Sequence, residues 1–186
     1  MRNILKEGKS NMKEKKYIII GTICLILVLL IVVVFAGKKG NEEKLEYSND
    51  PNVIVKNAEA EAAAVTEGAK KAFDNIDLAK YLELYKGDTP SLVMLARESC
   101  YYCNIAEPIV QSIMKKYKID IYYLDPDKFT EEEKNDFINS NERFSDGFGT
   151  PMLFLVGNNS IIDVVEGLTD RAHYIEFFKL NGFIKE

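Results

Sequence analysis

Tryptophan is absent from this chain of 186 residues, histidine occurs once and cysteine three times. A zinc site takes four nitrogen or sulfur ligands, so this supply argues against one. Three cysteines, one of them inside an apolar run, cannot build a framework of structural disulfides. The formal net charge of -5 is modest and argues against nucleic acid as the main partner. Any special chemistry must therefore come from few residues.

One long apolar run is present near the N-terminus. Residues 17–37 contain no charged side chain, and their length suits a membrane-spanning helix. Residues 1–16 have an excess of basic side chains, whereas acidic ones slightly prevail over 38–50. The positive-inside rule therefore predicts a cytoplasmic N-terminus and an extracytoplasmic remainder in a single-pass cell-membrane protein. A cleaved signal peptide ending near Ala36 is the alternative.

The rest of the chain divides by composition. Residues 38–72 are predicted to form a tether or helical spacer, within which 58–71 are rich in helix formers. That stretch is either a spacer or a first helix packed on the domain. Residues 73–186 are predicted to form the folded domain.

Hydrophobic periodicity predicts strands alternating with helices in this domain. A capping box formed by Thr130 and Glu133 marks the start of one helix, and Thr169 is the predicted cap of the last one. The pattern favours a mixed α/β sheet covered by helices. The predicted helices are 76–85, 104–116, 130–139 and a C-terminal helix, and the predicted strands are 91–95, 119–124, 151–156 and 161–165.

Cys100 and Cys103 lie two residues apart, where the predicted strand 91–95 gives way to a helix. This spacing lets the two sulfurs form and reopen a small disulfide ring. A cysteine beside the positive end of a helix dipole favours the thiolate, which is the species that attacks disulfides. The pair therefore predicts redox chemistry in the exported domain.

Further residues accompany the cysteine pair. Pro108 lies in the following helix, Thr150 and Pro151 precede the predicted hairpin, and Gly167 ends its second strand. With this set, the segment from about residue 73 to 186 resembles the thioredoxin superfamily. More narrowly, the predicted anchored arrangement resembles membrane-anchored extracytoplasmic thioredoxin-like proteins, including those found with bacteriocin export in Gram-positive bacteria.

The resemblance implies a thioredoxin-like fold and a role for each matching residue. It implies that Cys100 is the exposed nucleophile and Cys103 the buried resolving thiol. It also implies that Pro108 kinks the active-site helix and that Pro151 follows a cis peptide bond. The loop of Thr150 and Pro151 then offers backbone groups to a substrate peptide.

The chain departs from thioredoxin in two respects. Met94 occupies the position of the buried aspartate that accepts the proton of the resolving cysteine. Glu107, four residues after Cys103 on the same helical face, is the candidate replacement; a solvated helix acid is the alternative. Tyr101 and Tyr102 stand between the cysteines, so the thiolate-stabilising histidine of strong oxidases is missing, which slightly favours a reductase.

We therefore expect a membrane-tethered thiol–disulfide oxidoreductase whose only redox centre is the Cys100–Cys103 disulfide, without metal or other cofactor. Tyr101, Tyr102, Thr150 and Pro151 are the predicted substrate-binding residues, with Phe148 and Met152 adding to an apolar rim. The expected partners are cysteine-containing exported proteins, an extracytoplasmic or membrane redox partner, and the lipid bilayer through residues 17–37. A thioredoxin-fold accessory that binds an exported peptide or secretion partner is the alternative. The direction of electron flow stays open.

Overall fold

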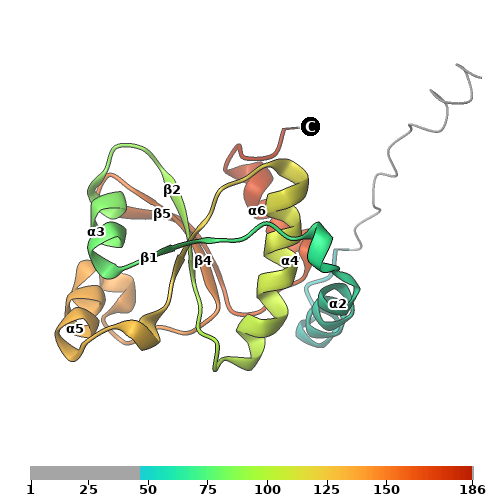
Figure 1. Ribbon diagram of the computed structural model, residues 1–186, viewed down its shortest axis with the longest axis horizontal. Coiled ribbons are helices and arrows are strands. Elements are labelled where there is room, and N and C mark those ends of the chain that lie inside the picture. The colour runs from blue at the N-terminus through green and yellow to red at the C-terminus, as the bar shows by residue number, and fades with distance from the viewer. Residues whose placement is uncertain (1–46, 186) are drawn as a thin grey trace, which may run out of the picture. The chain divides into compact units, whose positions relative to one another are not determined.

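A five-stranded sheet with helices on both faces forms the centre of the computed structural model, which describes residues 47–185 (Figure 1). The predicted segment 17–37 lies outside the described residues. Within 47–185, no helix is long and apolar enough to cross a membrane. The strands are β1 (Asp74–Ile76), β2 (Ser91–Leu95), β3 (Tyr122–Leu124), β4 (Met152–Gly157) and β5 (Ser160–Glu166). The α-helices are α2 (Pro51–Ala64), α3 (Leu78–Lys86), α4 (Tyr101–Tyr117), α5 (Glu131–Ser140) and α6 (Arg171–Leu180).

The strands lie in the order β1-β3-β2-β4-β5. Strands β1, β3 and β2 are parallel, while β4 runs antiparallel to β2 and β5 antiparallel to β4. The result is a mixed parallel and antiparallel sheet, as the sequence pattern predicted. Short 3-10 turns at Glu67–Ala69, Pro126–Lys128 and Glu142–Phe144 complete the connections.

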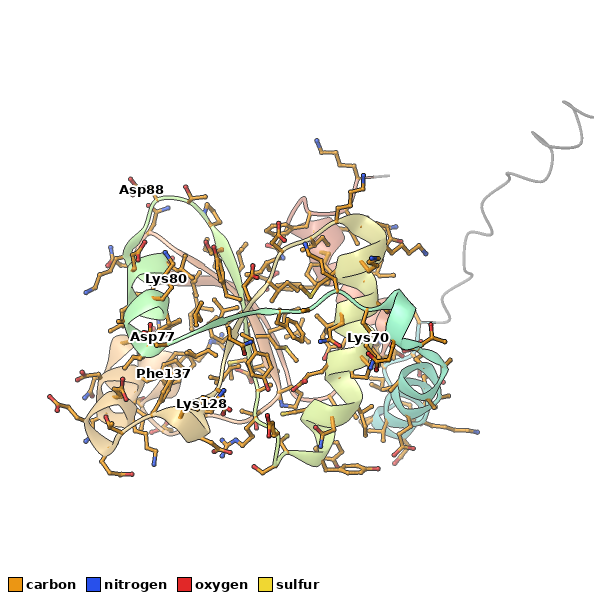
Figure 2. All side chains as sticks on the ribbon, viewed as in Figure 1. Lys70, Asp77, Lys80, Asp88, Lys128 and Phe137 are labelled. Atoms are coloured by element: carbon orange, nitrogen blue, oxygen red, sulfur yellow. The ribbon has the colours of Figure 1, made fainter. Side chains whose placement is uncertain are left out.

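Side chains alternate between the two faces of the sheet because successive residues of a strand point to opposite sides. On β2, Leu92 and Met94 join the hydrophobic cluster that contains residues of α4 and α6. Val93 and Leu95 join the cluster beneath α3 and α5, where Phe137 is fully buried (Figure 2). Figure 1 shows α3 and α5 on one face and α2, α4 and α6 on the other.

Local signals explain where several elements begin. The capping box of Thr130 and Glu133 is present at the start of α5, as predicted. The hairpin of β4 and β5 turns through Asn158 and Asn159, which both have positive φ, a conformation that asparagine tolerates. Asp77 accepts a hydrogen bond from the Lys80 amide at 2.8 Å and so caps α3 (Figure 2).

Several predicted boundaries were wrong. Strand β3 begins at Tyr122, three residues after the predicted start of the strand 119–124. Residue 76 belongs to the three-residue strand β1, because the capping group Asp77 starts the helix at Leu78, two residues later than the apolar pattern suggests. Helix α4 begins at Tyr101 rather than 104, since the Cys100 side chain itself serves as its cap. Helix α6 is capped by Asp170, whose carboxylate accepts from the His173 amide, rather than by Thr169.

Helix α2 occupies part of the region predicted as tether or spacer. Asp50 caps it by accepting from the Asn52 amide at 2.9 Å, and Pro51 is its first residue. Ala58 is fully buried and belongs to the same hydrophobic cluster as residues of α4. Glu61 accepts a hydrogen bond from the Arg171 amide at 2.8 Å, which joins α2 to the start of α6. Of the two alternatives, the structure has the packed first helix, and the folded unit extends N-terminal to residue 73.

The packing of α2 predicts unequal effects of the same substitution on its two sides. Ala58→Lys places a charge in a site without solvent access, so we expect the free energy of unfolding to fall by about 3 kcal/mol. Ala60→Lys is the matched control because Ala60 is exposed on the same helix; its effect should stay within about 0.5 kcal/mol. Urea unfolding measures both. Equal stability of the two variants would contradict the packing of α2.

Candidate active site

Cys100 lies at the junction of β2 and α4, where it is the N-cap residue of the helix. Its backbone is extended, with φ -88° and ψ 117°, and its sulfur accepts a hydrogen bond from the Cys103 amide at 3.2 Å. The first amides of a helix have no partner within the helix, and their aligned dipoles favour a negative group. The sequence thus folds so that one sulfur meets the positive end of α4, as the cysteine spacing predicted.

The two sulfurs lie in different surroundings. Both cysteines are free thiols; Cys100 is half-buried, whereas Cys103 is fully buried. Burial acts to raise the pKa of Cys100, but hydrogen bonds from the Cys103 side chain, Thr150 and the helix-start amides outweigh it, so this pKa is lowered. Burial, together with the hydrogen bond to Cys100, raises the pKa of Cys103 to about 12. Cys100 is therefore the more acidic and more accessible thiol.

The loop before β4 faces the Cys100 sulfur. The Thr150–Pro151 peptide bond is cis, the isomer that the resemblance implies, and the Cys100 thiol donates a hydrogen bond to the Thr150 carbonyl at 3.4 Å. The Gly167 amide donates to the Pro151 carbonyl at 2.8 Å and so holds this loop against the end of β5. Segments that are 50 residues apart in the chain thus meet at one sulfur.

Tyr101 and Tyr102 are both on the surface, with 64% and 49% of their area exposed. Their rings contact each other edge to face, with centroids 5.5 Å apart. The Tyr101 hydroxyl donates to the carboxylate of Glu59 on α2 at 3.1 Å. Helix α2 therefore reaches the dipeptide between the cysteines, a contact that no local sequence signal announced.

A pocket of about 230 Å³ adjoins the cis-proline loop. Gly147, Phe148, Gly149 and Thr150 are among its lining residues. Met152 also lines the pocket but is only 4% exposed, and the Phe148 ring packs edge to face on Phe137. The predicted apolar rim is thus more buried at these two residues than at the tyrosines.

Met94 is fully buried on β2, on the sheet face that α4 covers. Glu107 on α4 is half-buried, and the hydroxyl of Tyr123 on β3 donates to its carboxylate at 2.9 Å. Burial raises the pKa of Glu107; the Tyr123 hydrogen bond lowers it, and the nearby Glu98 and Asp125 carboxylates raise it further, leaving a net rise. Glu107 is therefore not fully solvated, and no ion pair joins it to a cation within residues 47–185.

Pro108 and His173 each belong to a helix of the fold, and neither forms a hydrogen bond with the Cys100 sulfur within residues 47–185. Pro108 lies inside α4, as expected. The single histidine, His173, contacts the Asp170 carboxylate through Nδ1 at 2.7 Å and stacks on Tyr47, so it supports the start of α6. Between residues 47 and 185, no group of three or more histidine, cysteine or acidic side chains is arranged to hold a metal ion.

Two residues of the site escaped prediction from the sequence. Glu59 lies in the stretch expected to be a spacer, 42 residues from its partner Tyr101. Tyr123 belongs to a predicted strand, but its pairing with Glu107 depends on which face of β3 points toward α4. Strand β2 is apolar on both faces and gives no such signal, so only its register, which pairs Met94 with Tyr123, shows that both residues lie on the face that α4 covers.

In comparisons with known proteins, the chain is similar only to solved structures, at low sequence identity. No protein-family model matches the chain, and no curated protein matches it either. Thioredoxin f2 of Chlamydomonas reinhardtii is 12% identical with a TM-score of 0.47, and the match covers 61% of this chain and 100% of that one. Thioredoxin of Aeropyrum pernix is 17% identical with a TM-score of 0.44, covering 57% and 84%. Mitochondrial thioredoxin 3 of Saccharomyces cerevisiae is 15% identical with a TM-score of 0.43, covering 57% and 93%.

The unequal surroundings of the two thiols predict their alkylation. In the full-length chain carrying Cys24→Ser, iodoacetamide should modify Cys100 with a pH midpoint below the ordinary pKa of 9.0. Cys103→Ala removes one hydrogen bond that lowers this pKa, so its midpoint should lie at higher pH. Mass spectrometry of quenched samples measures both curves. A lower midpoint in Cys103→Ala would contradict the role assigned to that hydrogen bond.

The burial of Glu107 predicts that the substitution Glu107→Gln stabilises the fold by an amount that depends on pH. Because the native state favours the protonated carboxyl, its stabilising contribution is present below the ordinary pKa of 4.5 and is lost as pH rises through the raised native pKa. Glu107→Gln cannot ionise, so its free energy of unfolding relative to wild type should increase between pH 4 and pH 7, a window of roughly three units. Glu132→Gln, on the exposed side of α5, controls for the loss of a surface charge. A Glu107→Gln difference that is flat with pH would refute this.

Proposed function

We propose that this protein is a membrane-tethered thiol–disulfide oxidoreductase that acts on exported proteins. The observation that carries the proposal is the Cys100 sulfur, which accepts from the Cys103 amide at the start of α4 and lies 3.4 Å from the Thr150 carbonyl. A low-pKa, accessible thiol beside a second, buried thiol is the arrangement that thiol–disulfide exchange requires.

The exchange proceeds in two displacements. The Cys100 thiolate attacks a client disulfide, forms a mixed disulfide and releases one client sulfur as thiolate. The Cys103 thiolate then attacks Cys100 Sγ, releases the second client sulfur and closes the Cys100–Cys103 bond. The client gains two electrons, and the protons of the two cysteines end on its sulfurs through solvent. An oxidase performs the same steps in reverse.

Cys103 needs a base because its pKa of about 12 leaves little thiolate near neutral pH. We assign that role to Glu107, which stands four residues after Cys103 on α4 and has no cation within its described contacts. Tyr101, Tyr102 and the Thr150–Pro151 loop border Cys100 and supply the surface for a client peptide. Without a histidine between the cysteines, we favour reduction of clients over their oxidation.

Localisation and partners follow from the N-terminal sequence. Residues 17–37 anchor the chain in the cell membrane, residues 1–16 stay cytoplasmic and the domain acts on the extracytoplasmic side. The redox centre is the Cys100–Cys103 pair alone. A membrane or extracytoplasmic redox partner returns that pair to the dithiol state after each turnover.

Insulin reduction tests the proposal. With dithiothreitol as the reductant that regenerates the dithiol, we expect the full-length Cys24→Ser chain to catalyse the precipitation of insulin, and the added Cys100→Ser change should abolish this because the attacking sulfur is lost. Cys103→Ala should instead accumulate a mixed disulfide, seen on a non-reducing gel and absent from Cys100→Ser. In cells, the trapped partners should be exported proteins.

The alternative is an accessory that binds an exported peptide through the exposed Tyr101 and Tyr102, with redox secondary. It predicts that peptide binding survives Cys100→Ser while insulin reduction is absent from every form of the chain, the parent included. That result would replace the oxidoreductase proposal.

A further inference from the structure

Met94 occupies the position at which the resemblance to thioredoxin would place a buried aspartate. A base for Cys103 must therefore come from another element. Tyr123, beside Met94, points to where that base stands. Met94 pairs with Tyr123 across the parallel strands β2 and β3, and both belong to the hydrophobic cluster that contains Cys103. The Tyr123 hydroxyl therefore lies on the same covered face of the sheet as the buried thiol.

Tyr123 links that face to the active-site helix. Its ring is 8% exposed and packs against Phe73, with centroids 5.3 Å apart. Its hydroxyl donates to Glu107 Oε1 at 2.9 Å, across 16 residues of chain. A buried ring with one hydroxyl aimed at a carboxylate restricts where that carboxylate can stand, because an unpaired polar group there would be costly.

We infer that Tyr123 is a positioning residue of the exchange reaction, holding the Glu107 carboxylate as an ionised base for Cys103 in place of the missing aspartate. This inference rests on the proposed exchange function. The hydrogen bond acts in the direction that such a role needs, because it favours the charged carboxylate.

The other charged groups around Glu107 act against ionisation. Glu98, in the loop before α4, and Asp125, at the end of β3, each raise the pKa of Glu107, as burial does most strongly. The pKa of Tyr123 is itself raised, by burial first and then by its hydrogen bond to Glu107 and the charges of Glu107, Asp125 and Cys103. Tyr123 therefore stays a protonated donor while Glu107 titrates.

The test separates the two displacements of the reaction. The reduced full-length Cys24→Ser chain is mixed with excess dithiobis(nitrobenzoate) in a stopped-flow instrument over a range of pH. The first release of thionitrobenzoate reports attack by Cys100, and the second reports attack by Cys103. Tyr122→Phe is the matched control, because it removes a hydroxyl from the same strand on the opposite face of the sheet.

In the parent chain we expect the rate of the second release to fall at low pH, where Glu107 is protonated; this fall is the acid limb of the pH profile. Tyr123→Phe should move that limb to higher pH, because the hydrogen bond that lowers the Glu107 pKa is lost. Glu107→Gln should abolish the limb and slow the second release on the order of 100-fold, the usual size of a general-base contribution. Tyr122→Phe should match the parent, and the first release should be unchanged in all variants.

Other outcomes separate the inference from the function it rests on. If the first release is missing in the parent chain, the exchange function itself fails. If both releases occur but Tyr123→Phe leaves the acid limb in place, or slows the reaction equally at all pH values, Tyr123 is only a packing residue. The inference is also overturned if Tyr122→Phe shifts the limb as much as Tyr123→Phe does.

Discussion

The hydrogen bond from the Cys103 amide to the Cys100 sulfur sets the geometry of the candidate site. It ties the first thiol to the start of α4, where unpaired amides favour negative charge. The Thr150 carbonyl also contacts this sulfur and accepts a hydrogen bond from the Cys100 thiol. Burial alone raises the pKa of Cys100, and the net lowering follows from the hydrogen bonds of the Cys103 side chain, the Thr150 side chain and the first amides of α4.

Several predictions from the sequence succeeded because they depend on neighbouring residues. The cysteine spacing, the capping box at Thr130 and the turn at Asn158 act within a few residues, and each element formed near its predicted place. Helix α2 was harder because its charged side chains gave only a weak apolar face. What holds it is long-range: a buried Ala58 and a carboxylate that accepts from the Arg171 amide.

The parts of the site that escaped prediction are pairs formed across the sheet or between helices. Glu107 could be proposed from its spacing to Cys103, since helix periodicity is local. Its partner Tyr123 could not, because a three-residue strand offers too little alternation to fix which face is covered. The same limit applies to Glu59, whose contact with Tyr101 requires that α2 be packed beside α4. Such pairs follow from register and packing.

The Glu107–Tyr123 pair also bears on why the core tolerates a carboxyl group at all. A buried carboxyl without a cation costs stability when it ionises, and a glutamine could keep the Tyr123 hydrogen bond without that cost. Met94 shows that this core accepts an apolar side chain on the neighbouring strand. A group that titrates where a neutral one would pack as well fits the proton transfer proposed for Glu107. In the proposed exchange reaction the proton comes from Cys103, the buried thiol one helical turn away.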